Sequence, residues 1–229
     1  MNISLLQFTI VVIGDKHNPT IVDRHFLQLQ KIVPKTWLSE VDDDKVITTP
    51  MLARVPYKNG VLIQVEPQRA QFCDASTRDP GKSEIARVAG DFVTVLRHVH
   101  YKSVGINFNC LIEMPAPESY LIKRFLKAGD WQTQENELNS IGLRMIYGIN
   151  DGFLTISMDA GVAVRRDDPQ GQERPVMFLN ANIHRDCQDY PAAEIIKKHL
   201  ESVASDWIMF QKLAGKLLDG SQVRHEVDK

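Results

Sequence analysis

Two turn signals, one in each half of the chain, constrain the fold more than any other feature. The first is the Asn59-Gly60 pair within YKNGVLIQV, and the second is the Asp151-Gly152 pair within YGINDGFLTIS. Asn-Gly and Asp-Gly favour tight hairpin turns because these residues adopt positive φ angles readily. Each turn leads into an alternating apolar run, so the sequence predicts two β-hairpins and an antiparallel sheet.

Alternation and β-branched residues predict about seven strands in total. Val104, Ile106, Phe108, Cys110 and Ile112 are expected on one face of a strand. Proline removes a ladder donor, so the strands around Pro50, Pro56 and Pro67 are expected to be edge-like or irregular. The expected strands are 3–13, 46–56, 60–72, 103–112, 140–148, 152–164 and 176–184.

Apolar residues at helical spacing predict helices over 22–32 and 85–99, a short helix that Pro117 opens, and a long C-terminal helix over 189–218. The last would be on the order of 40 Å long at 1.5 Å per residue, long enough to cross a sheet. The tail 221–229 is charged and is expected to be flexible.

The order of these elements is β-α-β-β-α and then β-α-β-β-β-α. One interpretation is a tandem pseudo-repeat with halves 1–100 and 101–220, similar in order to duplicated saddle-shaped folds. The other is a domain with two ordinary hairpins. Both give a single α+β domain over 1–229, with an antiparallel sheet and helices mainly on one face.

Composition narrows the class of protein. A net charge of −2 and a pI near 6.4 give no electrostatic reason to expect nucleic acid or an anionic membrane. Three widely spaced cysteines argue against a disulfide framework and suit a reducing compartment. The N-terminal segment lacks the basic residues of a targeting signal, and no apolar run is long enough to span a bilayer. We therefore expect a cytoplasmic protein.

Catalytic and metal motifs are weak. The sequence has no Walker, Rossmann, nucleophile-elbow or zinc-protease pattern. His98 with His100, and His184 with Cys187, have spacings that zinc ligands use. The favoured interpretation of His98 and His100 is a pair at a helix end, so we expect no metal and no cofactor. Cys73 and Cys187 have no orienting base nearby in the sequence, and no catalytic residue is assigned.

One face of the predicted sheet is unusually rich in polar side chains. Asparagine is depleted in strands, yet it occurs twice as an i, i+2 pair. The candidate ligand-binding residues are Arg144, Asp159, Asn180, Asn182, His184, Asn107 and Asn109. A solvated sheet face is the simpler interpretation.

The first strand is apolar on both sides, because Ile3, Leu5 and Val11 alternate with Leu6 and Phe8. Its second face should be covered by another part of the chain or by another subunit. The favoured hypothesis is a non-enzymatic binding or assembly protein with a protein partner or a homo-oligomer. The alternative is an enzyme or a small-ligand protein with a polar pocket on the sheet face.

Overall fold

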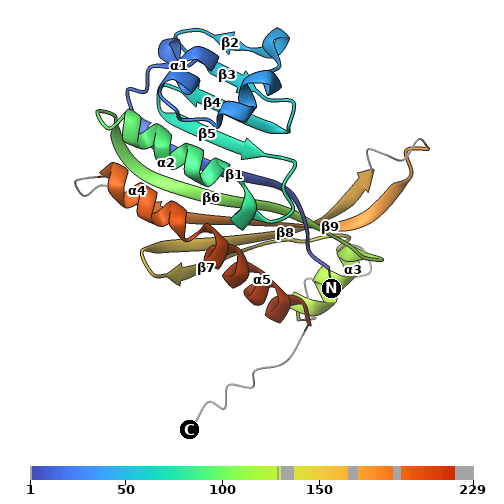
Figure 1. Cartoon of the computed structure of the whole chain (residues 1–229). Coiled ribbons are helices and arrows are strands. Elements are labelled where there is room, and N and C mark those ends of the chain that lie inside the picture. Colours follow the sequence, from blue (N-terminus) through green and yellow to red (C-terminus); the bar gives the residue numbers. More distant parts are fainter. Residues whose placement is uncertain (1, 128, 130–136, 165–169, 188–191, 220–229) are drawn as a thin grey trace.

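A single nine-stranded antiparallel sheet forms the frame of the molecule in the computed structural model (Figure 1). The structure describes residues 2–127, 129, 137–164, 170–187 and 192–219. The strand order is β2-β3-β4-β5-β1-β6-β9-β8-β7. The strands are β1 (Ser4–Asp15), β2 (Ile47–Thr48), β3 (Ala53–Pro56), β4 (Val61–Glu66), β5 (Arg69–Asp74), β6 (His100–Glu113), β7 (Gly142–Ile149), β8 (Gly152–Val164) and β9 (Glu173–Asp186).

The α-helices are α1 (Arg24–Leu29), α2 (Ile85–Val95), α3 (Pro117–Phe125), α4 (Ala192–Glu201) and α5 (Val203–Asp219). Short 3-10 turns lie at η1 (Pro19–Ile21), η2 (Lys35–Glu40), η3 (Asp43–Lys45) and η4 (Pro80–Lys82). Helices α2, α4 and α5 cover one face of the sheet (Figure 1). The predicted α+β class, with an antiparallel sheet and helices mainly on one face, is thus confirmed. No helix within the described ranges is long and apolar enough to cross a membrane.

Both predicted hairpins form at the turn signals. At the first, Gly60 has a φ of +89°, and the Asn59 side chain accepts a hydrogen bond from Val61 N at 3.1 Å. At the second, Ile149 pairs with Gly152, and Asp151 has a φ of +63°. These left-handed conformations are the ones that Gly, Asn and Asp tolerate best.

The sheet has two strands more than predicted because two proline-containing segments are divided. The predicted strand 60–72 turns at Pro67 and Gln68, so β4 and β5 form a hairpin of their own. The predicted strand 46–56 is interrupted around Pro50 and contributes the two-residue β2 and then β3. In each case proline is the residue least compatible with a continuous ladder.

The strand order is symmetric about the central pair β1 and β6. Moving outward on one side gives β5, β4 and β3, and on the other side β9, β8 and β7. Helix α2 follows the first set in the chain and α4 follows the second, and the two helices pack together. Two copies of one unit would produce this order, and β2 and α5 would then be extra elements of the first and second copy. The division of the chain into halves at residue 100 stays a prediction.

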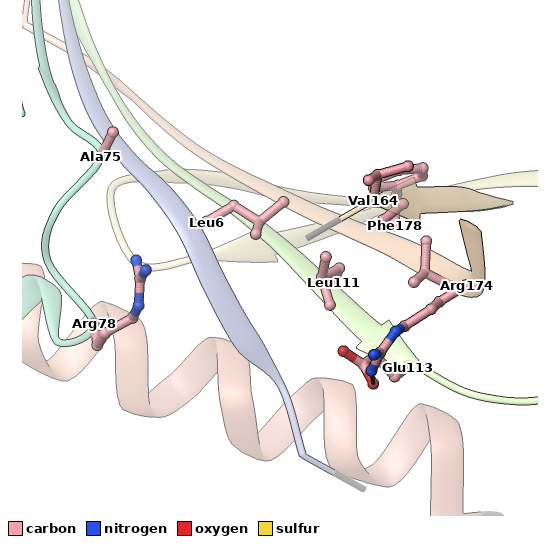
Figure 2. Close-up of a pocket in the computed structure, with 10 residues that line it drawn as sticks. Leu6, Ala75, Arg78, Leu111, Glu113, Val164, Arg174 and Phe178 are labelled. Carbon is pink, nitrogen blue, oxygen red and sulfur yellow. Dashed lines mark ion pairs between the residues drawn. The ribbon is translucent and has the colours of Figure 1, made fainter. Parts of the chain in front are cut away.

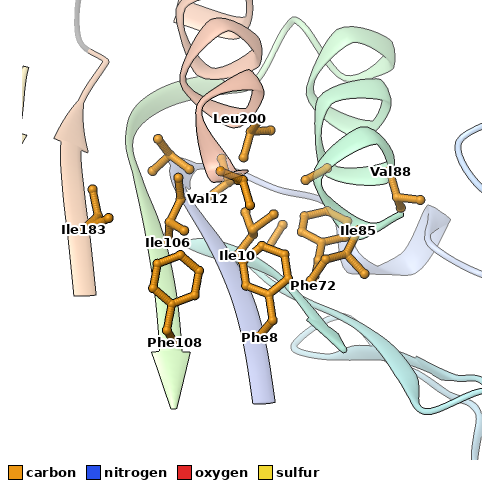
Figure 3. Close-up of a cluster of buried hydrophobic side chains, with 14 of the residues drawn as sticks. Phe8, Ile10, Val12, Phe72, Ile85, Val88, Ile106, Phe108, Ile183 and Leu200 are labelled. Atoms are coloured by element: carbon orange, nitrogen blue, oxygen red, sulfur yellow. The ribbon is translucent and has the colours of Figure 1, made fainter. Parts of the chain in front are cut away.

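The core lies between the sheet and the helices (Figure 3). All five apolar residues predicted to share a face of β6 are buried. Phe108 stacks on Phe8 and Phe210, with ring centroids 5.7 and 5.8 Å apart, and it meets Trp207 edge-on at 5.1 Å. These rings join β1, β6 and α5 at the centre of the sheet.

The C-terminal helical segment is divided at Ser202 into α4 and the longer α5. Ser202 Oγ lies 2.7 Å from the carbonyl oxygen of His199 and 2.9 Å from Asp206 Oδ2, and its single proton donates to one of the two at a time, which holds the junction in place. The predicted helix start at 189 and the predicted tail 221–229 lie outside the described residues.

The assignment of faces in β1 was wrong for its first residues. A bulge between Leu5 and Gln7 opposite β6 shifts the alternation by one residue. Leu5 therefore joins Phe8 in the core and is 3% exposed, whereas Leu6 is 42% exposed on the other side. The bulge could not be predicted from the sequence, because Leu5 and Leu6 are equally apolar and do not show which of them faces the core.

Candidate functional site: the open sheet face

The open face is the side of the sheet opposite α2, α4 and α5. On β6 its residues are those that alternate with the buried set, and they include Asn107 and Asn109. Strand β9 lies beside β6, and its register places Asn182 opposite Asn107 and Asn180 opposite Asn109. The two predicted i, i+2 pairs thus form one four-residue amide block on adjacent strands.

Hydrogen bonds connect part of this block. Asn182 Nδ2 donates to Asn107 Oδ1 at 2.6 Å, and Asn109 Nδ2 donates to Gln7 Oε1 at 3.3 Å. The Asn180 side chain has no hydrogen-bond partner within the described part of the chain. All four asparagines are half-buried among their neighbours. The block therefore keeps free donors and acceptors on a surface that is partly shielded from water.

The register extends the block into two parallel rows of polar side chains, one through Asn109 and Asn180 and the other through Asn107 and Asn182. On β8, Ser157 lies opposite Asn180 and continues the first row, and Thr155 lies opposite Asn182 and continues the second. On β1, Gln7 lies opposite Asn109 and Thr9 lies opposite Asn107. The rows run across four neighbouring strands, and they place hydroxyl and amide groups side by side along the middle of the open face.

The other three predicted site residues lie at the margins. Arg144 is exposed on β7 and lies opposite Ser157, so the width of β8 separates it from Asn180. Asp159 lies opposite Gly142 of β7, where its carboxylate occupies the space that a Cβ would need. His184 lies beyond Asn182 along β9, and its Nε2 is 3.3 Å from Asp186 Oδ1. The structure thus gathers the four asparagines and leaves the other three residues outside the block.

Gly105 of β6 lets the asparagine amides pack closely against the sheet. Gly105 of β6 is opposite His184 in β9, and a Cβ at Gly105 would lie 3.3 Å from Asn182 Nδ2. The absence of a side chain there lets the Asn182 amide lie against the sheet. The sequence showed this glycine inside an alternating strand, which is a signal for close approach of another group.

An apolar groove borders the amide block at one end of the open face (Figure 2). It has a volume of about 580 Å³, and its walls include Leu6, Leu111 and Phe178. Arg78 lies at one end, where Nη1 donates to Leu5 O at 3.3 Å. At the other end Arg174 and Glu113 approach to 3.7 Å. Leu6 contributes to this groove only because of the bulge in β1.

A second hollow, of about 450 Å³, lies on the helix side near the Asn150-Asp151 turn. At its base Arg185 and Asp206 make a bidentate ion pair with distances of 2.9 and 2.7 Å. Their side chains are only 7% and 5% exposed. Because such a pair holds β9 against α5, it acts first as a structural tie. Sequence reasoning missed this tie, although Arg185 comes two residues after the inward-facing Ile183 and therefore shares its face of β9.

The cysteine and histidine side chains give no sign of a reactive or metal-binding site among the described residues. Cys73, Cys110 and Cys187 are buried free thiols. Burial raises the pKa of the Cys110 thiol to about 12 and that of Cys187 to about 11, which disfavours the reactive thiolate. Burial lowers the pKa of His199 beside the second hollow. Within the ranges that the structure describes, no three His, Cys, Asp or Glu side chains form a group that could hold a metal ion.

The fold and this face define the class of protein, an α+β protein built on one curved antiparallel sheet with helices on a single face. Comparisons with protein-family models, with curated proteins and with solved structures found no match to the chain.

Proposed function

We propose that the chain is a non-enzymatic, cytoplasmic binding or assembly protein that holds a protein partner on its open sheet face. The observation that carries the proposal is the half-buried amide block, in which the Asn180 side chain lacks a partner among the described residues. A polar group that is partly desolvated and unpaired gains free energy when a ligand supplies the missing hydrogen bond.

The surroundings of the block support a protein partner. Apolar side chains border the polar rows, with Leu6 and Phe178 at one end and Phe153, which is 53% exposed, at the other. Interfaces commonly combine apolar and aromatic contacts with a small number of direct hydrogen bonds. The amides would then fix the orientation of the partner, and the apolar margins would contribute the buried area.

The alternative of a polar catalytic pocket has less support. It requires Arg144, Asp159 and His184 to converge on the amides. The strand register keeps them on separate strands or further along β9, and no hydrogen bond among the described residues connects them to the block. A binding surface explains the flat polar rows more directly than a pocket does.

Site-specific photo-crosslinking tests the proposal. A photoreactive amino acid at position 157 lies in the middle of the open face, and one at position 208 lies on the exposed side of α5. We expect an adduct from position 157 alone in the native host, and we expect Asn180→Arg to abolish it by blocking the face. If position 157 gives no adduct, or if Asn180→Arg leaves its adduct unchanged, the proposal is wrong.

A further inference from the structure

The two edges of the sheet differ in how well they are protected from pairing with another chain. The β2 edge is two residues long, and Pro50 follows it closely. The β7 edge is eight residues long, GLRMIYGI, with no proline, lysine or acidic residue. Short strands, prolines and charges are the devices that prevent edge pairing, and β7 has only Arg144.

The outer side of β7 has no neighbouring strand in the part of the chain that the structure describes. Figure 1 shows β7 as the outermost strand at the lower end of the sheet. Its pairing with β8 is regular over its whole length, without a bulge that would twist the edge away. Within the described residues, no backbone hydrogen bond reaches β7 from the outside. Ile146, near its middle, is 61% exposed.

We propose that β7 pairs with β7 of a second copy of this chain, antiparallel and about a two-fold axis, so that one sheet continues across both molecules. This inference goes beyond the proposed function, whose surface is the open sheet face, and it names a second copy of the chain as the partner of the β7 edge. Pairing would satisfy the outward N–H and C=O groups of both edges, with roughly one hydrogen bond per paired residue.

The sequence of β7 is self-complementary in one register. Opposite residues of an antiparallel pair lie on the same face, and a two-fold axis at Ile146 places each Ile146 opposite its copy. Arg144 then lies opposite Gly148 of the other molecule. A Cβ at Gly148 would have no atom within 4 Å, so the space above it is free for an arginine side chain.

The other face of β7 fits the same register. Met145 lies opposite Tyr147 of the other copy, and Leu143 lies opposite Ile149. All four side chains are partly buried against the core of their own chain. Pairing would therefore continue an apolar layer on the helix side. A register with its axis at Arg144 would instead oppose two like charges, which is destabilising.

Disulfide trapping tests the register as well as the dimer. In the proposed pairing, the Ile146→Cys chain brings two thiols directly opposite each other, at Cα separations within the range that a disulfide bridges. Arg144→Cys is the matched control, because it lies on the same strand and face but would be opposite Gly148. The native cysteines are buried, so the parent chain gives the background.

We expect mild oxidation to cross-link the Ile146→Cys chain and to leave Arg144→Cys and the parent chain monomeric on a non-reducing gel. Light scattering should show that the average mass of the parent chain rises from monomer to dimer at concentrations on the order of micromolar. The association is expected to be weak because the interface consists mainly of one pair of strands. A chain that is monomeric up to about 100 µM, or a dimer that Ile146→Cys does not trap, overturns the proposal.

Introducing a lysine at either edge of the sheet tests whether the dimer forms through β7 and not through β2. Ile146→Lys should abolish the dimer, whereas Ile47→Lys, at the exposed edge strand β2, should leave it intact. A dimer that survives Ile146→Lys also overturns the β7 pairing. Asn180→Arg blocks the open face without touching β7, so its effect on the crosslink from position 157 reports on the proposed function alone.

Discussion

Acid should destabilise this protein through one buried histidine. His17 is 4% exposed, and its ring lies near Phe92 and Tyr101, with centroids 6.2 and 5.8 Å away. Neither ring nitrogen has a hydrogen-bond partner within the described residues. Burial lowers the pKa of His17 from 6.5 to about 4, while Asp15 opposes this shift and His98 adds to it.

The sign follows from proton binding. The unfolded chain protonates His17 as the pH falls below 6.5, whereas the folded chain keeps the ring neutral until about pH 4. The free energy of unfolding therefore falls from about pH 6.5 downward and levels off below pH 4. Since one pKa unit corresponds to about 1.4 kcal/mol, His17 should account for at most about 2 kcal/mol between pH 7 and pH 5.

Urea unfolding at pH 5, 6 and 7, followed by tryptophan fluorescence, measures this loss. His17→Phe and His17→Leu cannot be protonated, so both should show a smaller loss of stability between pH 7 and pH 5 than the parent chain. His25→Gln, at an exposed position of α1, is the control and should keep the full loss. Equal losses in the parent and both His17 variants would show that the ring is not the source.

Two further changes test the packing. Asp206→Ala leaves the buried Arg185 guanidinium without its carboxylate and should cost about 3–5 kcal/mol in the free energy of unfolding; a loss under about 1 kcal/mol would mean that the pair is not desolvated. Gly152→Ala places a Cβ 2.0 Å from His184 O and should lower the melting temperature strongly. The matched change Gly148→Ala meets no atom and should be nearly neutral, so equal effects of the two glycine changes would contradict the register of β8 and β9.

Local patterns predicted the elements of this fold better than their pairing. The alternation around Phe108 correctly predicted the buried face of β6, because period-two burial is written directly in the sequence. The turn at Pro67 was missed since Gln68 carries no strong turn signal, and the apolar pattern resumes immediately after it.

The sequence identified the asparagines of the amide block but did not predict that they lie next to one another. The pairs around Asn107 and Asn182 were recognised as unusual in strands, but their contact depends on β6 and β9 being neighbours across a long stretch of chain. The Arg185–Asp206 pair was missed for the same reason, although an arginine and an aspartate on two apolar faces are each a signal of a buried partner.

The central position of β1 has a consequence for synthesis on the ribosome. Strands β3, β4, β5 and β1 all lie within residues 4–74, so this half of the sheet can assemble before the rest of the chain emerges. Until β6 follows, the long edge of β1 between Ser4 and Asp15 stays without its second neighbour. A nascent chain paused before residue 100 would therefore expose the unpaired backbone edge of β1. Because an exposed strand edge can pair with another chain, slow translation through β6 would favour aggregation.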